Sequence, residues 1–236
     1  QKDLNHPGLT HLLDFGWDET SQNYFIVSEY LVARELFTAT IGWTPWVIEE
    51  LMVQVFRVLE YLHSRGLFHL NLKSSNLLVT PGKRLKITDL DLMRQCLPHQ
   101  PVGDPAYRAP ETIHGLPPDE RVDLYAMGVL FYSSLARKNP FQASSQGASL
   151  NNHTFLNPQP INQVKTSIPS YLNRILSGML EKNPGERYAK ATHIIRHINE
   201  LSGHSYPIET IETPLIDIPK NSPLIGRGDE LSQIQT

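Results

Sequence analysis

The amino-acid sequence predicts an α+β fold in which helices predominate, and three observations carry that prediction. β-rich runs cover residues 9–13 and 24–27, and polar residues separate them, as expected for paired strands. Apolar residues recur at helical spacing from Thr44-Pro45, where a helix would begin, to Gly66, where it would end. Further helical patterns cover residues 121–137, 169–182 and 189–202. Strands followed by mostly helices are typical of the α+β class.

The remaining segments are short or irregular. Leu77–Val79 and Leu85–Ile87 are strand-like runs, and Pro81-Gly82 would form the turn between them. Residues 97–120 are rich in proline and predict an ordered loop. Residues 142–167 are polar and predict a loop with at most a short helix, and the prolines after Gly203 predict a linker.

Composition excludes several functional classes. The chain has 236 residues, which fits one domain or a domain with an extension. Its 21 basic and 24 acidic residues form no basic stripe, so we expect no nucleic-acid partner. No apolar run is long enough to span a membrane, and no signal peptide opens the chain. The single Cys96 fits a reducing, cytoplasmic location. Because the chain starts at Gln1, we expect it to be part of a longer protein.

The segment with the clearest chemistry runs from His69 to Asn76. It is followed by Asp89-Leu90-Asp91 and then by Ala109-Pro110-Glu111. In this order the three segments resemble the protein kinase superfamily, whose signatures are H-R-D-L-x-x-x-N, D-F-G and A-P-E. Asp123 and Arg187 also stand where that family has a buried helix aspartate and a late arginine that pairs with the A-P-E glutamate. The resemblance covers residues 1–201. It implies a protein kinase-like fold: the C-terminal lobe, the hinge and the last small-lobe strands, with the first three strands absent from this chain.

The resemblance also assigns roles to residues of the site. Phosphoryl transfer requires positioned metal ions, neutralised phosphate charge and an oriented nucleophile, and Mg²⁺ prefers oxygen ligands. Asn76 and Asp89 would bind Mg²⁺, and Lys73 would contact phosphate. ATP would also contact residues of the hinge, the ribose site and the adenine floor, namely Ser28, Glu29, Leu31, Glu35 and Leu78. Structural roles fall to His69, Glu111, Asp123 and Arg187.

Four residues depart from the family pattern. Asn71 stands in place of the catalytic aspartate, and an amide cannot accept the proton of a substrate hydroxyl. Leu70 replaces the arginine that would pair with a phosphorylated activation loop, and residues 92–108 contain no Ser or Thr. Asp91 replaces the glycine of D-F-G, where its side chain makes the backbone less free. Asp104 stands where the family usually has Thr.

Asp104 leaves three interpretations open. Asn71 and Asp104 could be two independent changes in a site no longer used for transfer. Asp104 could instead form a structural ion pair with Lys73. In the third interpretation Asp104 is a displaced catalytic base, so that the catalytic group would comprise Asn71, Lys73 and Asp104.

The C-terminal residues suggest a further module. The segment Pro223–Leu231 resembles the one that leads into P-loop ATPase modules, although no Walker A motif follows it. We therefore expect the end of a small lobe with the hinge at residues 1–31 and a C-terminal lobe at 32–202. A linker at 203–223 and the start of an ATPase-like module at 224–236 would follow.

These observations predict a protein kinase-like domain of a cytoplasmic signalling protein. It would bind Mg-ATP but be catalytically impaired, with a regulatory role and a protein substrate or regulatory partner. Two alternatives remain: an active Ser/Thr protein kinase that needs no activation-loop phosphorylation, and a scaffold that binds no nucleotide. Whether the domain is an enzyme therefore stays open, because a kinase fold alone does not establish kinase activity.

Overall fold

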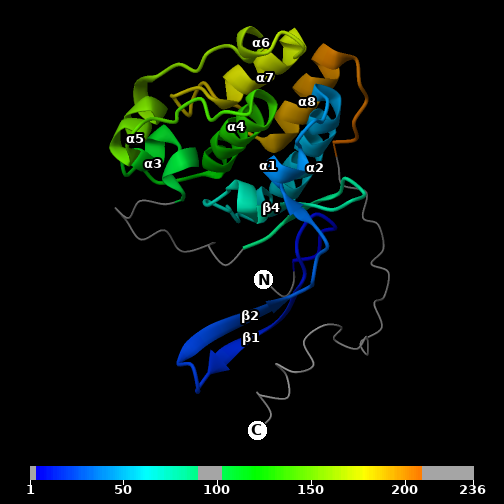
Figure 1. Cartoon of the computed structure of the whole chain (residues 1–236), viewed down its shortest axis with the longest axis vertical. Coiled ribbons are helices and arrows are strands. Elements are labelled where there is room, and N and C mark those ends of the chain that lie inside the picture. Colours follow the sequence, from blue (N-terminus) through cyan, green and yellow to red (C-terminus); the bar gives the residue numbers. More distant parts are fainter. Residues whose placement is uncertain (1–3, 90–102, 209–236) are drawn as a thin grey trace.

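The computed structural model describes residues 4–89 and 103–208. These residues form a lobe of helices from which a two-stranded hairpin projects (Figure 1). The predicted α+β class is confirmed. The predicted positions Asp91 and Cys96, and the tail with the ATPase-like segment, lie outside the described residues.

The strands make two small antiparallel sheets. The hairpin consists of β1 (Leu12–Asp18) and β2 (Asn23–Ser28). The second sheet has the order β3 (Arg34–Glu35), β4 (Leu77–Val79) and β5 (Leu85–Ile87). Leu9 joins this second sheet through a parallel bridge to Ile87. The first predicted strand is therefore wrong in its bounds, because Leu9 pairs outside the hairpin and β1 begins later and runs to Asp18.

The helices account for most of the lobe. They are α1 (Leu36–Ala39), α2 (Pro45–His63), α3 (Pro110–Ile113), α4 (Glu120–Ala136), α5 (Gln146–Phe155), α6 (Ile161–Val164), α7 (Ser170–Met179) and α8 (Ala191–Ser202). Two 3₁₀ turns, η1 (Ser74–Asn76) and η3 (Pro105–Tyr107), lie in the loops.

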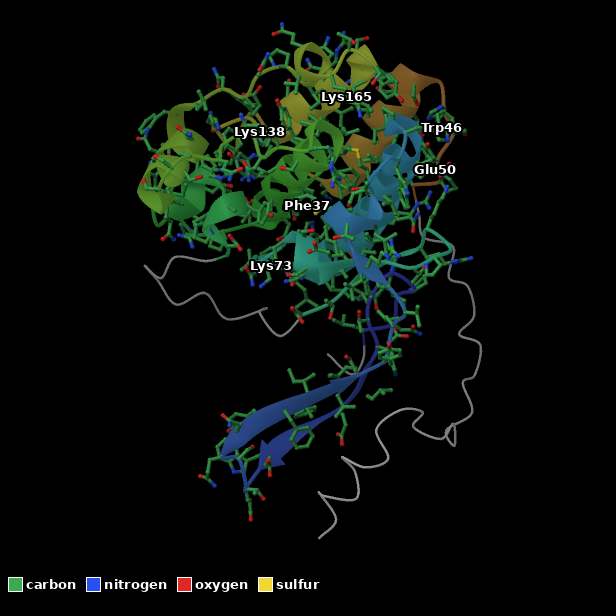
Figure 2. All side chains as sticks on the ribbon, in the orientation of Figure 1. Phe37, Trp46, Glu50, Lys73, Lys138 and Lys165 are labelled. Atoms are coloured by element: carbon green, nitrogen blue, oxygen red, sulfur yellow. The ribbon has the colours of Figure 1, made fainter. Side chains whose placement is uncertain are left out.

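Helix α4 is the centre of the core. Every residue from Val122 to Leu135 is buried, as expected for a helix that is apolar on all sides. It packs against α2 and α7, and α2 packs in turn against α8. Figure 1 shows α4 in the middle of the lobe with the other helices around it. The loop between α2 and β4, which contains Asn71 and Lys73, lies on the side of the lobe that faces the hairpin (Figure 2).

The polar segment 142–167 differs from its prediction. It contains the ten-residue α5 as well as the short α6. Helix α5 begins where the Ser145 hydroxyl accepts a hydrogen bond from the Ala148 N–H. It is fixed by one fully buried residue, His153, so it needs no apolar face that a sequence pattern would reveal.

The hairpin has a different character from the lobe. Apolar and aromatic side chains on both of its strands are exposed, among them Phe15, Tyr24 and Ile26. Within residues 4–89 and 103–208, no helix is both long and apolar enough to cross a membrane.

Candidate active site

The predicted catalytic loop lies between α2 and β4, and its backbone is strained. Leu70 in this loop has a φ of 62°, and Asp89, in the segment after β5, has a φ of 60°, so both lie in the left-handed region. A bulky residue such as Leu rarely adopts this conformation. Strained residues of this kind persist only where their surroundings hold them, and they cluster at functional sites.

Asp123 of α4 holds the strained loop. Its carboxylate accepts hydrogen bonds from the backbone N–H groups of His69 and Leu70, both at 2.8 Å, and from Nε2 of His63 at 2.9 Å. Burial alone would raise the pKa of the Asp123 carboxyl, but the hydrogen bonds and charges of His63 and His69 together outweigh it and hold the pKa below its ordinary value. The predicted structural position of Asp123 therefore has a clear physical basis.

His69 links the loop to the segment that ends at Asp89. Its Nε2 lies 3.1 Å from the Thr88 carbonyl oxygen, and its Nδ1 lies 3.4 Å from the backbone nitrogen of Asn71. A carbonyl oxygen only accepts hydrogen bonds, so Nε2 carries the proton and Nδ1 accepts. His69 is almost fully buried, and its ring connects Asn71 to Thr88, the residue before Asp89.

Asn76 and Asp89 come from neighbouring chain segments. The Asn76 carbonyl accepts a hydrogen bond from the Thr88 N–H at 3.0 Å, one residue before Asp89. The Asn76 side-chain Nδ2 donates to the Asn71 carbonyl at 3.0 Å. One amide oxygen and one exposed carboxylate suit Mg²⁺, which commonly binds through one or two protein carboxylates together with phosphate and water. The described residues contain no cluster of three His, Cys, Asp or Glu side chains that could hold a metal alone.

Lys73 lies just before η1, and Figure 2 shows it at the edge of the helical lobe that faces the hairpin. The structure does not bring it into an ion pair with Asp104. The Asp104 carboxylate instead accepts a hydrogen bond from the Ala106 N–H at 2.9 Å and caps η3. The ion pair of Asp104 with Lys73 therefore stays a prediction, since in this conformation the Asp104 carboxylate contacts a local backbone donor instead.

Asp104 does lie beside Asn71. Both residues line a small cleft together with Gly103, Tyr107 and Arg108. A Cβ on Gly103 would lie 2.6 Å from the Leu70 carbonyl oxygen, so the backbone approaches the loop more closely than a side chain would allow. Burial, together with the charges of Asp104 and Glu35, raises the pKa of Tyr107 to about 12, so the phenol stays neutral.

The segment after Gly103 is held from the other side by residues that the sequence did not single out. Nδ2 of Asn139 at 2.9 Å and Nε2 of His153 at 3.2 Å both donate to the Ala106 carbonyl. Burial lowers the pKa of His153 to about 4, with a contribution from the charge of Lys182. His63, which bonds Asp123, was also missed. Its place at the end of α2, six residues before His69, was the only sequence signal for it.

The predicted nucleotide-contact residues lie in and after the connection from hairpin to lobe. Ser28 ends β2 and is exposed, and Leu31 is half-buried. Glu35 pairs with Leu78 across the β3–β4 ladder, so these two come together. The Glu29 carboxylate accepts from the His11 N–H at 2.9 Å and from Lys86 Nζ at 2.7 Å, so this side chain ties the connection to β5.

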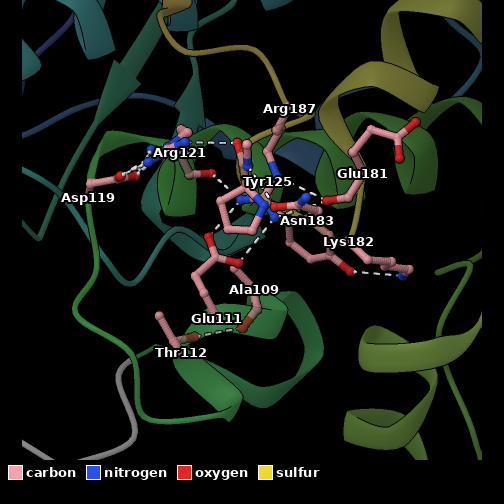
Figure 3. Close-up of polar contacts among 12 residues, drawn as sticks. Ala109, Glu111, Thr112, Asp119, Arg121, Tyr125, Glu181, Lys182, Asn183 and Arg187 are labelled. Carbon is pink, nitrogen blue, oxygen red and sulfur yellow. Dashed lines mark hydrogen bonds and ion pairs between the residues drawn. The ribbon is translucent and has the colours of Figure 1, made fainter.

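Glu111 and Arg187 form the buried ion pair that the sequence predicted (Figure 3). Two N–H groups of Arg187 contact the two carboxylate oxygens, at 2.6 and 3.1 Å. The remaining bonds of its guanidinium go to the backbone carbonyls of Glu181 and Arg121. All five donors are used. The pair joins α3 to the loop before α8, across 76 residues of sequence.

The candidate site therefore combines a buried ion pair, a strained loop held by a buried aspartate, and an asparagine on the segment next to an exposed aspartate. The family model described as "Protein kinase domain" matches residues 1–199. The chain belongs to the protein kinase family.

Several curated proteins are similar to this chain. A probable serine/threonine-protein kinase of Clostridium perfringens is 27% identical over 207 residues, which are 84% of this chain and 30% of that protein. Serine/threonine-protein kinase Pkn1 of Myxococcus xanthus is 29% identical over 200 residues, 79% of this chain and 28% of that protein. Human serine/threonine-protein kinase ULK3 is 33% identical over 153 residues, 61% of this chain and 32% of that protein. The chain thus spans about a third or less of these relatives.

Proposed function

We propose that this chain is a protein kinase-like signalling domain that binds Mg-ATP and transfers phosphate to protein Ser or Thr poorly or not at all. The observation that carries the proposal is Asn71. Its main chain is held at the centre of the loop by His69 and Asn76, yet its side chain is an amide.

The remaining site residues support nucleotide binding. Mg-ATP, when bound, would supply the phosphoryl group. Asp89 and Asn76 would hold the metal through oxygen atoms, and Lys73 would offset phosphate charge at the lobe's edge. Glu35 and Leu78, paired on adjacent strands, would line the ribose and adenine side.

The site lacks a side chain that can accept the proton of the substrate hydroxyl. A substrate hydroxyl becomes a better nucleophile when a nearby base accepts its proton, and a positioned base typically contributes about 10²–10⁴-fold in rate. Asn71 can orient a hydroxyl by a hydrogen bond but has no basic lone pair near neutral pH. We therefore expect the rate of phosphate transfer to be lower by about 10²–10⁴-fold than with a base at position 71.

A second candidate is an active Ser/Thr kinase that requires no phosphorylation of its activation loop. The hydrogen bonds of Asp123 and the Glu111–Arg187 pair favour it, because side chains of the chain itself hold the catalytic loop and α3 in place. The printed names of the relatives, which are Ser/Thr protein kinases, favour it as well.

The test is phosphate transfer from labelled ATP to a generic Ser/Thr protein substrate, measured with the full protein beside Asn71→Asp and Asp89→Ala. The proposal predicts little transfer by the natural protein and about 10²–10⁴-fold more in Asn71→Asp. Transfer by the natural protein that Asp89→Ala abolishes would instead establish the active kinase.

Isothermal titration with Mg-ATP tests the binding half of the proposal. We expect a binding heat that Asp89→Ala removes and that His193→Gln, on the exposed face of α8, leaves unchanged. No heat from the natural protein would establish the third candidate, a scaffold that binds no nucleotide.

The wider setting is proposed on the sequence alone. The chain would belong to a cytoplasmic protein in which a P-loop ATPase-like module follows the linker. Its partners would be a protein substrate or a regulatory protein.

A further inference from the structure

The six residues after α8, Gly203–Ile208, lie along α2 and are called the strap here. Gly203, with a φ of 75°, ends α8 and turns the chain. Figure 1 shows the chain passing from the end of α8 down the side of α2. The strap forms no helix or strand of its own.

The strap is held at a buried carboxylate. Glu49 of α2 is fully buried and accepts three hydrogen bonds. One donor is the hydroxyl of Tyr171 on α7. The other two belong to the strap: Nδ1 of His204 at 2.7 Å and the hydroxyl of Tyr206 at 3.0 Å. A buried charge is costly unless it is hydrogen-bonded, so the strap provides most of what keeps Glu49 satisfied.

The main chain of the strap is bonded as well. The Tyr206 N–H donates to Asn199 Oδ1 at 2.8 Å, and Asn199 Nδ2 donates back to the Tyr206 carbonyl at 2.9 Å. Nε and Nη2 of Arg57 both donate to the Pro207 carbonyl, at 2.9 and 2.6 Å. The His204 ring also packs edge-on against Trp46, with 4.0 Å between ring centroids.

These contacts show that the strap runs along α2 from its first turn toward its C-terminal end. His204 touches Trp46 in the first turn of α2, and Pro207 bonds Arg57, which lies eleven residues further on or roughly 16 Å along the helix. The next residues of α2 bind the N-terminal segment. A Cβ on Gly8 would meet Val58, and the hydroxyl of Tyr61 accepts from the Asn5 N–H at 2.8 Å. The strap thus brings the chain from α8 to the place where the N-terminal segment packs.

We propose that the strap is a latch on α2, closed through Glu49, that opens without unfolding the helices. It is held largely by hydrogen bonds to single side chains, and its apolar contribution is limited to Tyr206 and Ile208, which pack against the core while only partly buried. This is the character of segments that open locally. When closed, it fixes the point at which the chain leaves the lobe, next to the N-terminal segment. When open, it releases Tyr206 from Glu49 and no longer fixes that point.

Hydrogen exchange of the whole 236-residue chain tests the latch. Tyr206→Phe removes one hydroxyl from Glu49, and Glu49→Gln replaces the carboxylate while keeping its size. Glu200→Gln, on the exposed face of α8, is the matched control. We expect the strap amides of the natural protein to exchange more slowly than an unstructured peptide but faster than α2. Tyr206→Phe should speed strap exchange about tenfold and leave α2 and α8 unchanged, and Glu200→Gln should change neither.

Three results would overturn the proposal. The strap amides of the natural protein could exchange at the unstructured rate, so that no closed state exists. Tyr206→Phe could leave strap exchange unchanged, so that Glu49 does not hold it. The strap and the helices could also speed up together in Tyr206→Phe, so that the strap opens only with the fold. Tyr206→Phe decides each of these even where Glu49→Gln does not fold.

Discussion

The Glu111–Arg187 pair and the loop around Asn71 are held in opposite ways. In the pair, the side chains themselves make the bonds: two donors of the Arg187 guanidinium reach the Glu111 carboxylate, and the other three reach backbone carbonyls. In the loop, the bonds that fix position go to main-chain groups: the N–H groups of His69, Leu70 and Asn71, and the Asn71 carbonyl. The loop therefore keeps its shape whatever side chain stands at position 71. A domain built in this way can lose its catalytic base without losing its architecture.

The largest effect should come from breaking the side-chain pair. Glu111→Ala leaves the Arg187 guanidinium buried without its counter-charge, and removing one partner of a buried pair costs about 3–5 kcal/mol. Urea unfolding should show this loss. Glu186 is an exposed glutamate next to Arg187. The free energy of unfolding of Glu186→Ala should stay within about 0.5 kcal/mol of that of the natural protein. A loss below about 1 kcal/mol in Glu111→Ala would contradict the stated role of the pair.

A smaller loss of stability should follow when the pH is lowered, because of His153. Burial lowers the pKa of this imidazole to about 4 in the folded chain, whereas an unfolded histidine titrates near 6.5. Between these values the unfolded state binds the proton and the folded state does not. Stability should therefore be complete above about pH 6.5 and fall as the pH drops toward 4.

Unfolding midpoints at pH 7 and pH 5 measure that slope. His153→Gln should show a shallower fall than the natural protein, while His193→Gln, on an exposed histidine, should keep the natural slope. The slope should not vanish in His153→Gln, because burial also lowers the pKa of His6 to about 4. Equal slopes in all three proteins would show that His153 does not fold in its neutral form.

The smallest effect should come from Asp104→Thr. Asp104 caps η3 through the Ala106 N–H, and a threonine hydroxyl can accept the same bond, so we expect a cost below about 1 kcal/mol and no change in phosphate transfer. Loss of a residual transfer activity in this variant would instead show that Asp104 is a displaced base beside Asn71.

Periodicity and caps identified most of the fold from sequence. Helices α2 and α4 are predicted to within a few residues, because α2 has a long apolar face with a Thr-Pro start and α4 is a long, mostly apolar run. Helix α5 was missed because it is polar and is fixed by one buried histidine. The first strand was misplaced because Leu9 pairs with Ile87, far along the chain, and no local pattern reports that contact.

The site shows the same limit. The Glu111–Arg187 pair and the structural place of Asp123 could be predicted because both belong to motifs in a fixed order. The partner of Glu29 is Lys86 and the partner of Asp104 is the nearby Ala106 N–H. Neither choice was visible in sequence, since several donors of equal quality compete for each carboxylate and only three-dimensional proximity decides between them.

The long sequence separation between Glu111 and Arg187 has a consequence for folding during translation. The chain is made from its N-terminus, and domains generally fold as units. Glu111 emerges from the ribosome 76 residues before the arginine that neutralises it. Until Arg187 arrives, the α3 carboxylate has no cation to bury against and stays hydrated. The helical lobe is therefore completed only near the end of its own translation. A chain that ends before α8 would expose apolar core residues, which chaperones and proteases recognise.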